Sequence, residues 1–209
     1  NNKKLISVTP YWSLSQVTQN GQKLPLNCSD DEAISLLEDS LSSAVEDQLI
    51  SDVPLGAFFS GGIDSSLVVS MMKTRSSQPV KTFTIGFDDS DYNEAIFAKV
   101  VAKHLGTEHS ELYISPQDAL DVIPQLSSTY DEPFADSSQI PTFLVAKMAS
   151  SHVKVALSGD GGDELFGGYN RYIWSRTIRN KTNWLPKSAL QVLGFSLGKV
   201  SAHTWNKIN

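Results

Sequence analysis

Cysteine is almost absent from this chain of 209 residues, because Cys28 is the only one. A single thiol forms no intrachain disulfide and leaves no CxxC pair for a zinc or redox site. This usage fits the reducing cytoplasm, where we expect the protein to act. The sequence also lacks an apolar run of roughly 18 residues and an apolar stretch near its start of signal-peptide length. We therefore expect no membrane insertion and no membrane partner.

Positive charge is in short supply as well. Lys and Arg number 17 against 23 Asp and Glu, which gives a formal net charge of −6. Neutralising phosphate backbones needs clustered Lys and Arg, so the composition argues against a nucleic-acid partner. The hydrophobic content of 40% is that of an ordinary globular protein. The length suffices for one main domain with a sizeable core.

Apolar periodicity predicts alternating strands and helices along most of the chain. The predicted strands are 54–59, 80–87, 108–114 and 153–158, and the helices between them are 66–73, 93–106, 117–129 and 139–151. A further helix begins near Ser29, a capping residue, and should end before Pro54. Alternation of this kind indicates an α/β fold with a mostly parallel sheet covered on both faces. Extra helices after residue 169 should not pack into the sheet.

The start of the chain differs from the rest. Residues 1–28 show no sustained period and carry a turn signal at Asn20-Gly21, which is typical of a linker. The first residue is Asn1 rather than methionine, so we expect the sequence to be a piece of a longer protein. Residues 29–209 would then form the main domain.

A glycine-rich string, SGGIDSS at residues 60–66, joins the first predicted strand to the next helix. The backbone N–H groups of such a turn and the positive end of the helix dipole favour an anion. A Walker A loop needs Gly-Lys-Ser/Thr and a dinucleotide loop needs GxGxxG, and the string has neither. It is either a tight turn that starts a helix or a phosphate-binding loop. Its candidate anion-binding residues are Ser60, Gly61, Gly62, Asp64, Ser65 and Ser66.

Acidic residues in and near these loops point to a metal. Asp64 would repel phosphates unless a cation lay between them, which indicates Mg²⁺. A second string, SGDGGDE at residues 158–164, follows the last predicted strand. Alone it could be a calcium loop or a solvated turn, although the spacing of EF-hand acids is not met. Strand ends of an open α/β sheet share one crevice, so Asp163 fits as a second carboxylate on the same magnesium.

Three strings carry a family resemblance: SDVPLGAFFSGGIDSS, DEPFADSSQIPTF and LSGDGGDELFGGY. Over about residues 50–172 the chain resembles the synthetase domain of the glutamine-hydrolysing asparagine synthetases, in the ATP-pyrophosphatase (PP-loop) superfamily. The resemblance implies an adenine-nucleotide α-hydrolase-like fold and cleavage between the α- and β-phosphates of ATP. The first loop would hold pyrophosphate, and the acids that match Asp64 and Asp163 would bind its Mg²⁺. The implied reaction is amidation of a carboxylate, with aspartate as the expected acceptor and ammonia as the nitrogen donor, through an acyl-adenylate.

The resemblance also implies roles for residues outside the metal site. Asp160, which is Glu in some relatives, is implied in the amidation step and is the candidate catalytic residue. Phe58 and Ile85 would cradle adenine, although ordinary strand packing is an equal interpretation. Ser158 and Gly159 would contact the nucleoside.

The acceptor side and the neighbouring domains follow from the same resemblance. Asp136 and Ser137 match the acceptor side of the family's site, with a polar Ser-rich capping loop as the alternative. Residues 1–28 would be the tail of an upstream glutaminase domain, and residues 29–209 the synthetase domain, shortened at its C-terminal end. The family's lysine near the α-phosphate cannot be assigned in this sequence. Three alternatives stay open. The acceptor could be another carboxylate, such as a sugar uronic acid, or the reaction could be a β-lactam-type cyclisation. The chain could also be an ATP-binding fragment without turnover, or it could form a homodimer.

Overall fold

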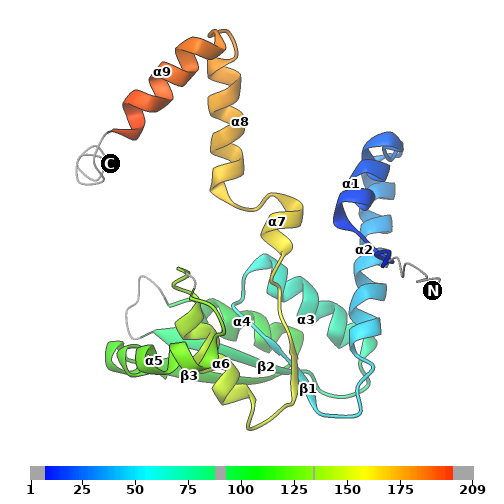
Figure 1. Ribbon diagram of the computed structural model, residues 1–209. Coiled ribbons are helices and arrows are strands. Elements are labelled where there is room, and N and C mark those ends of the chain that lie inside the picture. Colours follow the sequence, from blue (N-terminus) through cyan, green and yellow to red (C-terminus); the bar gives the residue numbers. More distant parts are fainter. Residues whose placement is uncertain (1–7, 88–92, 134, 200–209) are drawn as a thin grey trace, which may run out of the picture.

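The computed structural model describes residues 8–87, 93–133 and 135–199, and these form an α/β fold around one parallel sheet (Figure 1). The strands are β1 Leu55–Phe58, β2 Lys81–Phe87, β3 Glu108–Ile114 and β4 Val155–Leu157. They pair in the order β3-β2-β1-β4, and each pairing is parallel. The chain therefore moves from β1 to β3 in one direction and then returns to the other side of β1. The strand order reverses between β1 and β4, whose carboxyl ends lie side by side.

Helices cover both faces of this sheet. They are α3 Ile63–Arg75, α4 Ala95–Leu105, α5 Pro116–Thr129 and α6 Gln139–Ala149. The long helix α2 Asp30–Gln48 packs on α3 near its C-terminal end and otherwise projects away from the sheet (Figure 1). Because side chains alternate along a strand, Ala57 and Phe59 pack with α3 and α4 in one buried cluster. Phe58 faces the other way and packs with Phe83 and residues of α6 in a second cluster. The expected parallel sheet with helices on both faces is confirmed.

The helix ends follow from local sequence. Ser29 caps α2 with a reciprocal capping box, in which its hydroxyl accepts from the Glu32 N–H and its own N–H donates to the Glu32 carboxylate. Ser115 and Asp118 form the same box at α5. Gly106 ends α4 in the left-handed region at φ 65°. These three boundaries lie within two residues of those that the sequence predicts.

Two helices lie where the sequence predicts none. α1 Leu14–Lys23 passes through Asn20-Gly21, so the expected turn there is wrong. A glycine inside a helix costs about 1 kcal/mol relative to alanine, which neighbouring helix formers can offset. α7 Gly162–Phe166 follows the second glycine-rich loop and contains no buried residue. Such a short helix has no periodicity that a sequence could reveal.

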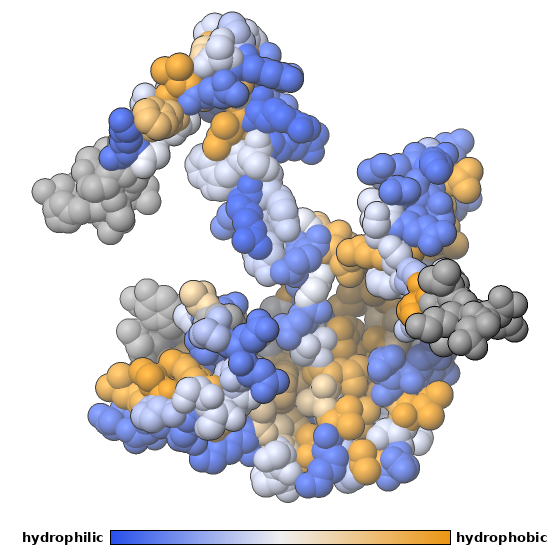
Figure 2. Space-filling view, in the orientation of Figure 1, coloured by the Kyte–Doolittle hydropathy of each residue, from blue (hydrophilic) through white to orange (hydrophobic). Residues whose placement is uncertain are grey.

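The C-terminal helices project away from the sheet, as expected (Figure 1). They are α8 Asn170–Thr182 and α9 Lys187–Gly198. Exposed apolar residues lie among hydrophilic ones on α8 and α9 (Figure 2). Trp174 in α8, for example, is 65% exposed. None of the helices in the described ranges combines the length and apolar character that crossing a bilayer requires.

Gly56 in β1 makes a test of this packing. A Cβ there would lie 2.8 Å from Phe83 Cε2 and 2.9 Å from the Lys81 carbonyl oxygen. Because β2 cannot retreat without breaking its ladder, we expect Gly56→Ala to lower the free energy of unfolding by about 1–3 kcal/mol, the usual cost of overpacking. Chemical denaturation measures this change. Gly21→Ala is the contrasting variant, since a Cβ at Gly21 meets nothing within 4 Å and the change replaces a glycine inside α1. It should leave the free energy of unfolding unchanged or raise it by up to about 1 kcal/mol; equal stability of both variants would contradict the expectation.

Candidate functional site

The first glycine-rich loop connects β1 to α3 and lies against α4. The Phe59 N–H donates to the Phe83 carbonyl at 2.9 Å, so strand pairing continues up to the residue before the loop. Gly61 has φ 76°, in the region that favours glycine. A Cβ at Gly61 would lie 2.5 Å from the backbone nitrogen of Ala98 in α4. Glycine is therefore required here by both conformation and space.

Serine hydroxyls hold this loop in shape. The Ser60 and Ser65 hydroxyls are hydrogen-bonded to each other at 3.0 Å. The Gly62 N–H donates to Ser60 Oγ at 3.2 Å, and Ser65 Oγ donates to the Gly62 carbonyl at 3.3 Å. The Ser66 hydroxyl is buried and has no hydrogen-bond partner in the described structure. Buried polar groups are normally paired, so Ser66 marks a position where a ligand could supply the missing partner.

The second loop, after β4, packs directly on the first. A Cβ at Gly159 would lie 2.7 Å from the backbone nitrogen of Ser65. A Cβ at Gly162 would collide with the carboxyl group of Asp64. Because these two glycines have no side chains, the loops can meet closely. Gly159 contacts the backbone of Ser65, and Gly162 contacts the Asp64 carboxyl group. The structure thus brings together the two loops that the sequence places at neighbouring strand ends.

The acids of the second loop occupy different surroundings. Asp160 is exposed, and its carboxylate accepts a hydrogen bond from Ser158 Oγ at 3.1 Å. Asp163 lies in α7 and is partly buried, with its Oδ1 at the place where Gly168 would carry a Cβ. Glu164 accepts from the Tyr169 hydroxyl at 2.7 Å, and this hydrogen bond lowers the pKa of Glu164 and raises the pKa of Tyr169.

Asp64 and Asp163, one from each loop region, are the candidate metal ligands. Within residues 8–87, 93–133 and 135–199, no three His, Cys, Asp or Glu side chains gather closely enough to hold an ion by themselves. Magnesium commonly takes one or two carboxylates and completes its octahedron with water and substrate phosphates. Asp64, which touches Gly162, and the neighbouring Asp163 fit such a partial set of ligands.

The other residues that the sequence singles out lie around the same edge of the sheet. Phe58 and Ile85 are partly buried, and both pack on the cluster that faces α6. Asp136 and Ser137 are exposed in the turn before α6. Asp136 accepts from the Ser138 N–H at 2.9 Å, and this hydrogen bond lowers the pKa of Asp136. Because α6 leads back to the start of β4, its first residues lie towards the carboxyl ends of the strands.

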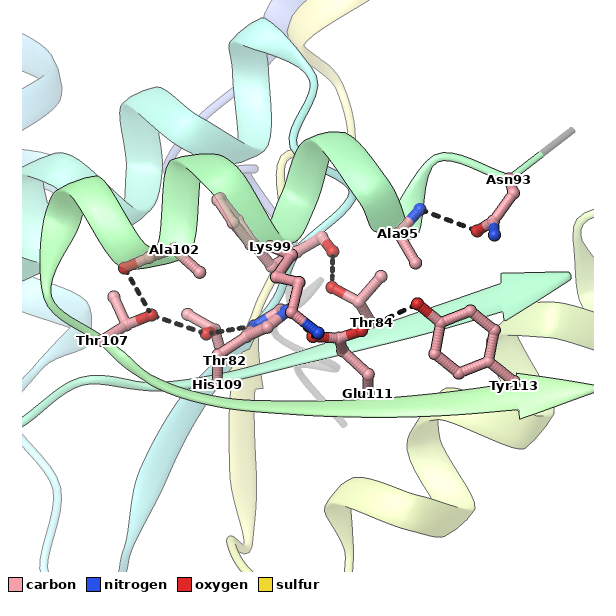
Figure 3. A network of polar contacts seen from close by, with 11 residues as sticks. Thr82, Thr84, Asn93, Ala95, Lys99, Ala102, Thr107, His109, Glu111 and Tyr113 are labelled. Atoms are coloured by element: carbon pink, nitrogen blue, oxygen red, sulfur yellow. Dashed lines mark hydrogen bonds and ion pairs between the residues drawn. The ribbon is translucent and has the colours of Figure 1, made fainter. Parts of the chain in front are cut away.

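A network of polar contacts that involves β2, β3 and α4 (Figure 3) reaches Phe59, the residue before the first loop. The Thr84 hydroxyl donates to the Phe59 carbonyl, one residue before the loop. Thr82 Oγ1 lies 2.9 Å from both Thr107 Oγ1 and His109 Nδ1. The His109 ring meets the Phe59 ring edge to face, with centroids 5.9 Å apart. No sequence motif marks this network, although polar threonines at alternate positions of a buried strand were its one visible signal.

Beyond His109 the network includes the charged side chains of Glu111 and Lys99. Glu111 lies 3.2 Å from Lys99 Nζ and accepts from the Tyr113 hydroxyl at 2.9 Å. His109 Nε2 lies 3.8 Å from the Glu111 carboxylate, too far for a hydrogen bond, and the His109 side chain is 9% exposed. Burial lowers the pKa of His109, while the Glu111 charge opposes that effect. His109 therefore favours the neutral state in the folded protein.

An open parallel sheet whose loops meet where the strand order reverses defines the doubly wound α/β class. Within that class the chain belongs to the asparagine synthase family, which its residues 36–208 match. It is 43% identical over 148 residues to asparagine synthetase (glutamine-hydrolyzing) 1 of Bacillus subtilis, covering 71% of this chain and 23% of that protein. It is 39% identical over 147 residues to asparagine synthetase (glutamine-hydrolyzing) 2 of Oryza sativa subsp. japonica, covering 64% and 24%.

The chain spans about a quarter of the length of these curated relatives, 23% and 24%. Among solved structures it is similar to NMN synthetase from Francisella tularensis, with a TM-score of 0.47 and 17% identity over 68% of this chain and 59% of that one. That similarity is too low to support an inference.

His109 predicts a pH dependence of stability. Its pKa is lower in the folded chain than in the unfolded chain, so the unfolded chain binds more protons between the two values. The contribution to the free energy of unfolding is fully present above about pH 6.5, the ordinary pKa of histidine, and is lost as the pH falls towards the folded value. We expect His109→Gln to flatten this fall in denaturation curves recorded between about pH 7.5 and 5. His104→Gln, at an exposed position, should keep the wild-type slope; parallel profiles for all three proteins would contradict the assignment.

Proposed function

We propose that this protein is an ATP-dependent ligase that converts a carboxylate, most directly the side chain of aspartate, into its amide. The carboxylate attacks the α-phosphate of ATP, which gives an acyl-adenylate and pyrophosphate, and ammonia then displaces AMP. The observation that carries the proposal is the contact between the two glycine-rich loops, at Gly159 and Gly162, in a chain of the asparagine synthase family. We place the protein in the cytoplasm, in line with its single cysteine.

The first loop would bind the pyrophosphate end of ATP. Gly62 is the N-cap of α3 and offers no side chain to cap the first N–H groups of the helix. Those N–H groups and the helix dipole favour phosphate oxygens. The unpartnered Ser66 hydroxyl can donate a further hydrogen bond. These fixed donors would stabilise the negative charge that develops on the departing pyrophosphate.

Asp64 and Asp163 would hold Mg²⁺. The ion would neutralise phosphate charge and favour departure of pyrophosphate. Phe58 and Ile85 would contact adenine, with Ser158 and Gly159 beside the nucleoside.

Asp160 would act on the ammonia that attacks the acyl-adenylate. Its carboxylate is exposed and is hydrogen-bonded to Ser158, so it can accept a proton from the incoming nitrogen. Asp136 and Ser137, in the turn before α6, would contact the carboxylate substrate that becomes the amide. In the full-length protein the ammonia would come from glutamine through an upstream glutaminase domain. The names of the relatives call those proteins glutamine-hydrolyzing.

Asp64 provides a test of the metal assignment. Asp64→Asn keeps the size of the side chain and removes the charge, so we expect it to weaken ATP binding in the presence of Mg²⁺. The loss should exceed the roughly tenfold effect of removing an outer-shell partner of a metal site. Titration calorimetry with MgCl₂, and again with EDTA, measures the effect. Asp47→Asn in α2 is the matched control; an equal loss with and without Mg²⁺ would count against a metal role.

Substitutions of Asp160 and Asp163 in the full-length enzyme should impair different steps of the proposed reaction. Asp163→Asn should slow ATP–pyrophosphate exchange, because it removes a proposed ligand of Mg²⁺. Asp160→Asn should keep substantial exchange and lose amide formation from ammonium by about 10²- to 10⁴-fold, the range for removing a general base. Isotope exchange and amide formation are measured side by side. If Asp160→Asn abolishes exchange as fully as Asp163→Asn does, both acids act in adenylation.

A further inference from the structure

The bend between α7 and α8 is fastened by polar and aromatic contacts next to the second loop. The Tyr169 hydroxyl donates to Glu164 Oε1 at 2.7 Å, from the start of α8 back to α7. The Arg171 guanidinium carbon lies 4.2 Å from the centroid of the Tyr169 ring and 5.6 Å from that of Tyr172. The two tyrosine rings lie 5.8 Å apart. A cation so placed over an aromatic ring restricts the position of the phenol group.

Three consecutive residues of α7 contact the segments on either side of it. Gly162 lies against the carboxyl group of Asp64 in the first loop. The Asp163 carbonyl accepts from the Gly168 N–H at 3.1 Å, and its carboxylate also lies against Gly168. Glu164 accepts from Tyr169. The position of Asp163 therefore depends on contacts immediately before and after it.

α7 has little else to hold its orientation. It is five residues long and buries none of them. A single helical turn is unstable by itself, because nucleation is costly and few hydrogen bonds repay it. Fixed contacts to neighbouring segments must set the direction in which α7 presents Asp163.

We propose that Glu164 and Tyr169 form a clasp that positions Asp163 for binding the divalent cation of the nucleotide. Both are positioning residues, since they act through Asp163. Arg171 stacks on the ring of Tyr169 and steadies the hydroxyl that closes the clasp. This inference rests on the proposed function, in which Asp163 is a ligand of the cation.

The clasp differs from a stabilising core contact. Glu164 is exposed, and a hydrogen bond near the surface contributes little to global stability because water competes for both partners. Opening the clasp should therefore change the local direction of α7 and leave the unfolding transition in place. A role that is only structural would lower the melting temperature instead.

Tyr169→Phe in the full-length protein tests the clasp, because it removes the hydroxyl and keeps the ring under Arg171. Mn²⁺ serves as the probe, and its affinity in the presence of ATP is measured by electron paramagnetic resonance. We expect Mn²⁺ affinity to fall by about tenfold, the lower end for losing an outer-shell partner. ATP binding in EDTA and the melting temperature should stay unchanged. Tyr172→Phe, in the same aromatic cluster, is the matched control and should bind Mn²⁺ as the wild type does.

Two further variants separate the clasp from the metal assignment. Glu164→Gln keeps an oxygen that can accept from Tyr169 and should retain most of the Mn²⁺ affinity, whereas Glu164→Ala should lose as much as Tyr169→Phe. If Asp163→Asn weakens Mn²⁺ binding and Tyr169→Phe does not, the clasp is wrong and the metal assignment stands. If Asp163→Asn leaves Mn²⁺ binding intact, the metal assignment fails and the clasp fails with it. A fall in the melting temperature of Tyr169→Phe that accounts for its lost affinity also overturns the proposal.

Discussion

The candidate site depends on a close approach of two backbone segments, which glycine alone permits. The second loop meets the start of α3 at Gly159 and the Asp64 carboxyl group at Gly162, where a Cβ would collide. Parallel pairing of β1 with β4 brings the segments to one edge of the sheet. The same pairing aligns the N-terminus of α3 with the acids of α7. Without side-chain-free positions at the contact, the loops would stand apart and their groups could not act on one ligand.

The site combines a negative side and a positive side in a small space. Its carboxylates, Asp64, Asp160 and Asp163, would repel an anionic nucleotide, and a divalent cation is the simplest way to reconcile them. The positive side comes from backbone N–H groups at the start of α3, whose N-cap Gly62 has no side chain. The network of Thr84 and His109 lies behind this loop and holds the residue from which it starts. The N–H groups at the start of α3 and the contacts that hold Phe59 are thus in place in the structure without a ligand.

Much of this arrangement follows from sequence, and the exceptions have physical reasons. Strand β3 was predicted with its observed bounds, because it lies between Gly106, which ends α4, and Ser115, which caps α5. The meeting of the two loops was predicted from the general behaviour of parallel sheets. α1 was missed because a glycine outweighed the residues around it, and α7 because one turn leaves no periodic signal. The His109 network joins residues that are 25 and 27 positions apart in sequence, so the alternating threonines of β2 were its only local sign and its partners could not be predicted.

The pairing of β1 with β4 also has a consequence for the order in which the chain folds. β1, α3 and β2 are close in sequence and can associate early, whereas Leu55 pairs with Val155 across a long stretch of chain. Contacts between distant residues form slowly, because the entropy of closing the loop is lost before the contact repays it. The second loop reaches the first only when that pairing is complete. If the proposed function holds, nucleotide binding would require this slow pairing, and a bound nucleotide would stabilise the paired state.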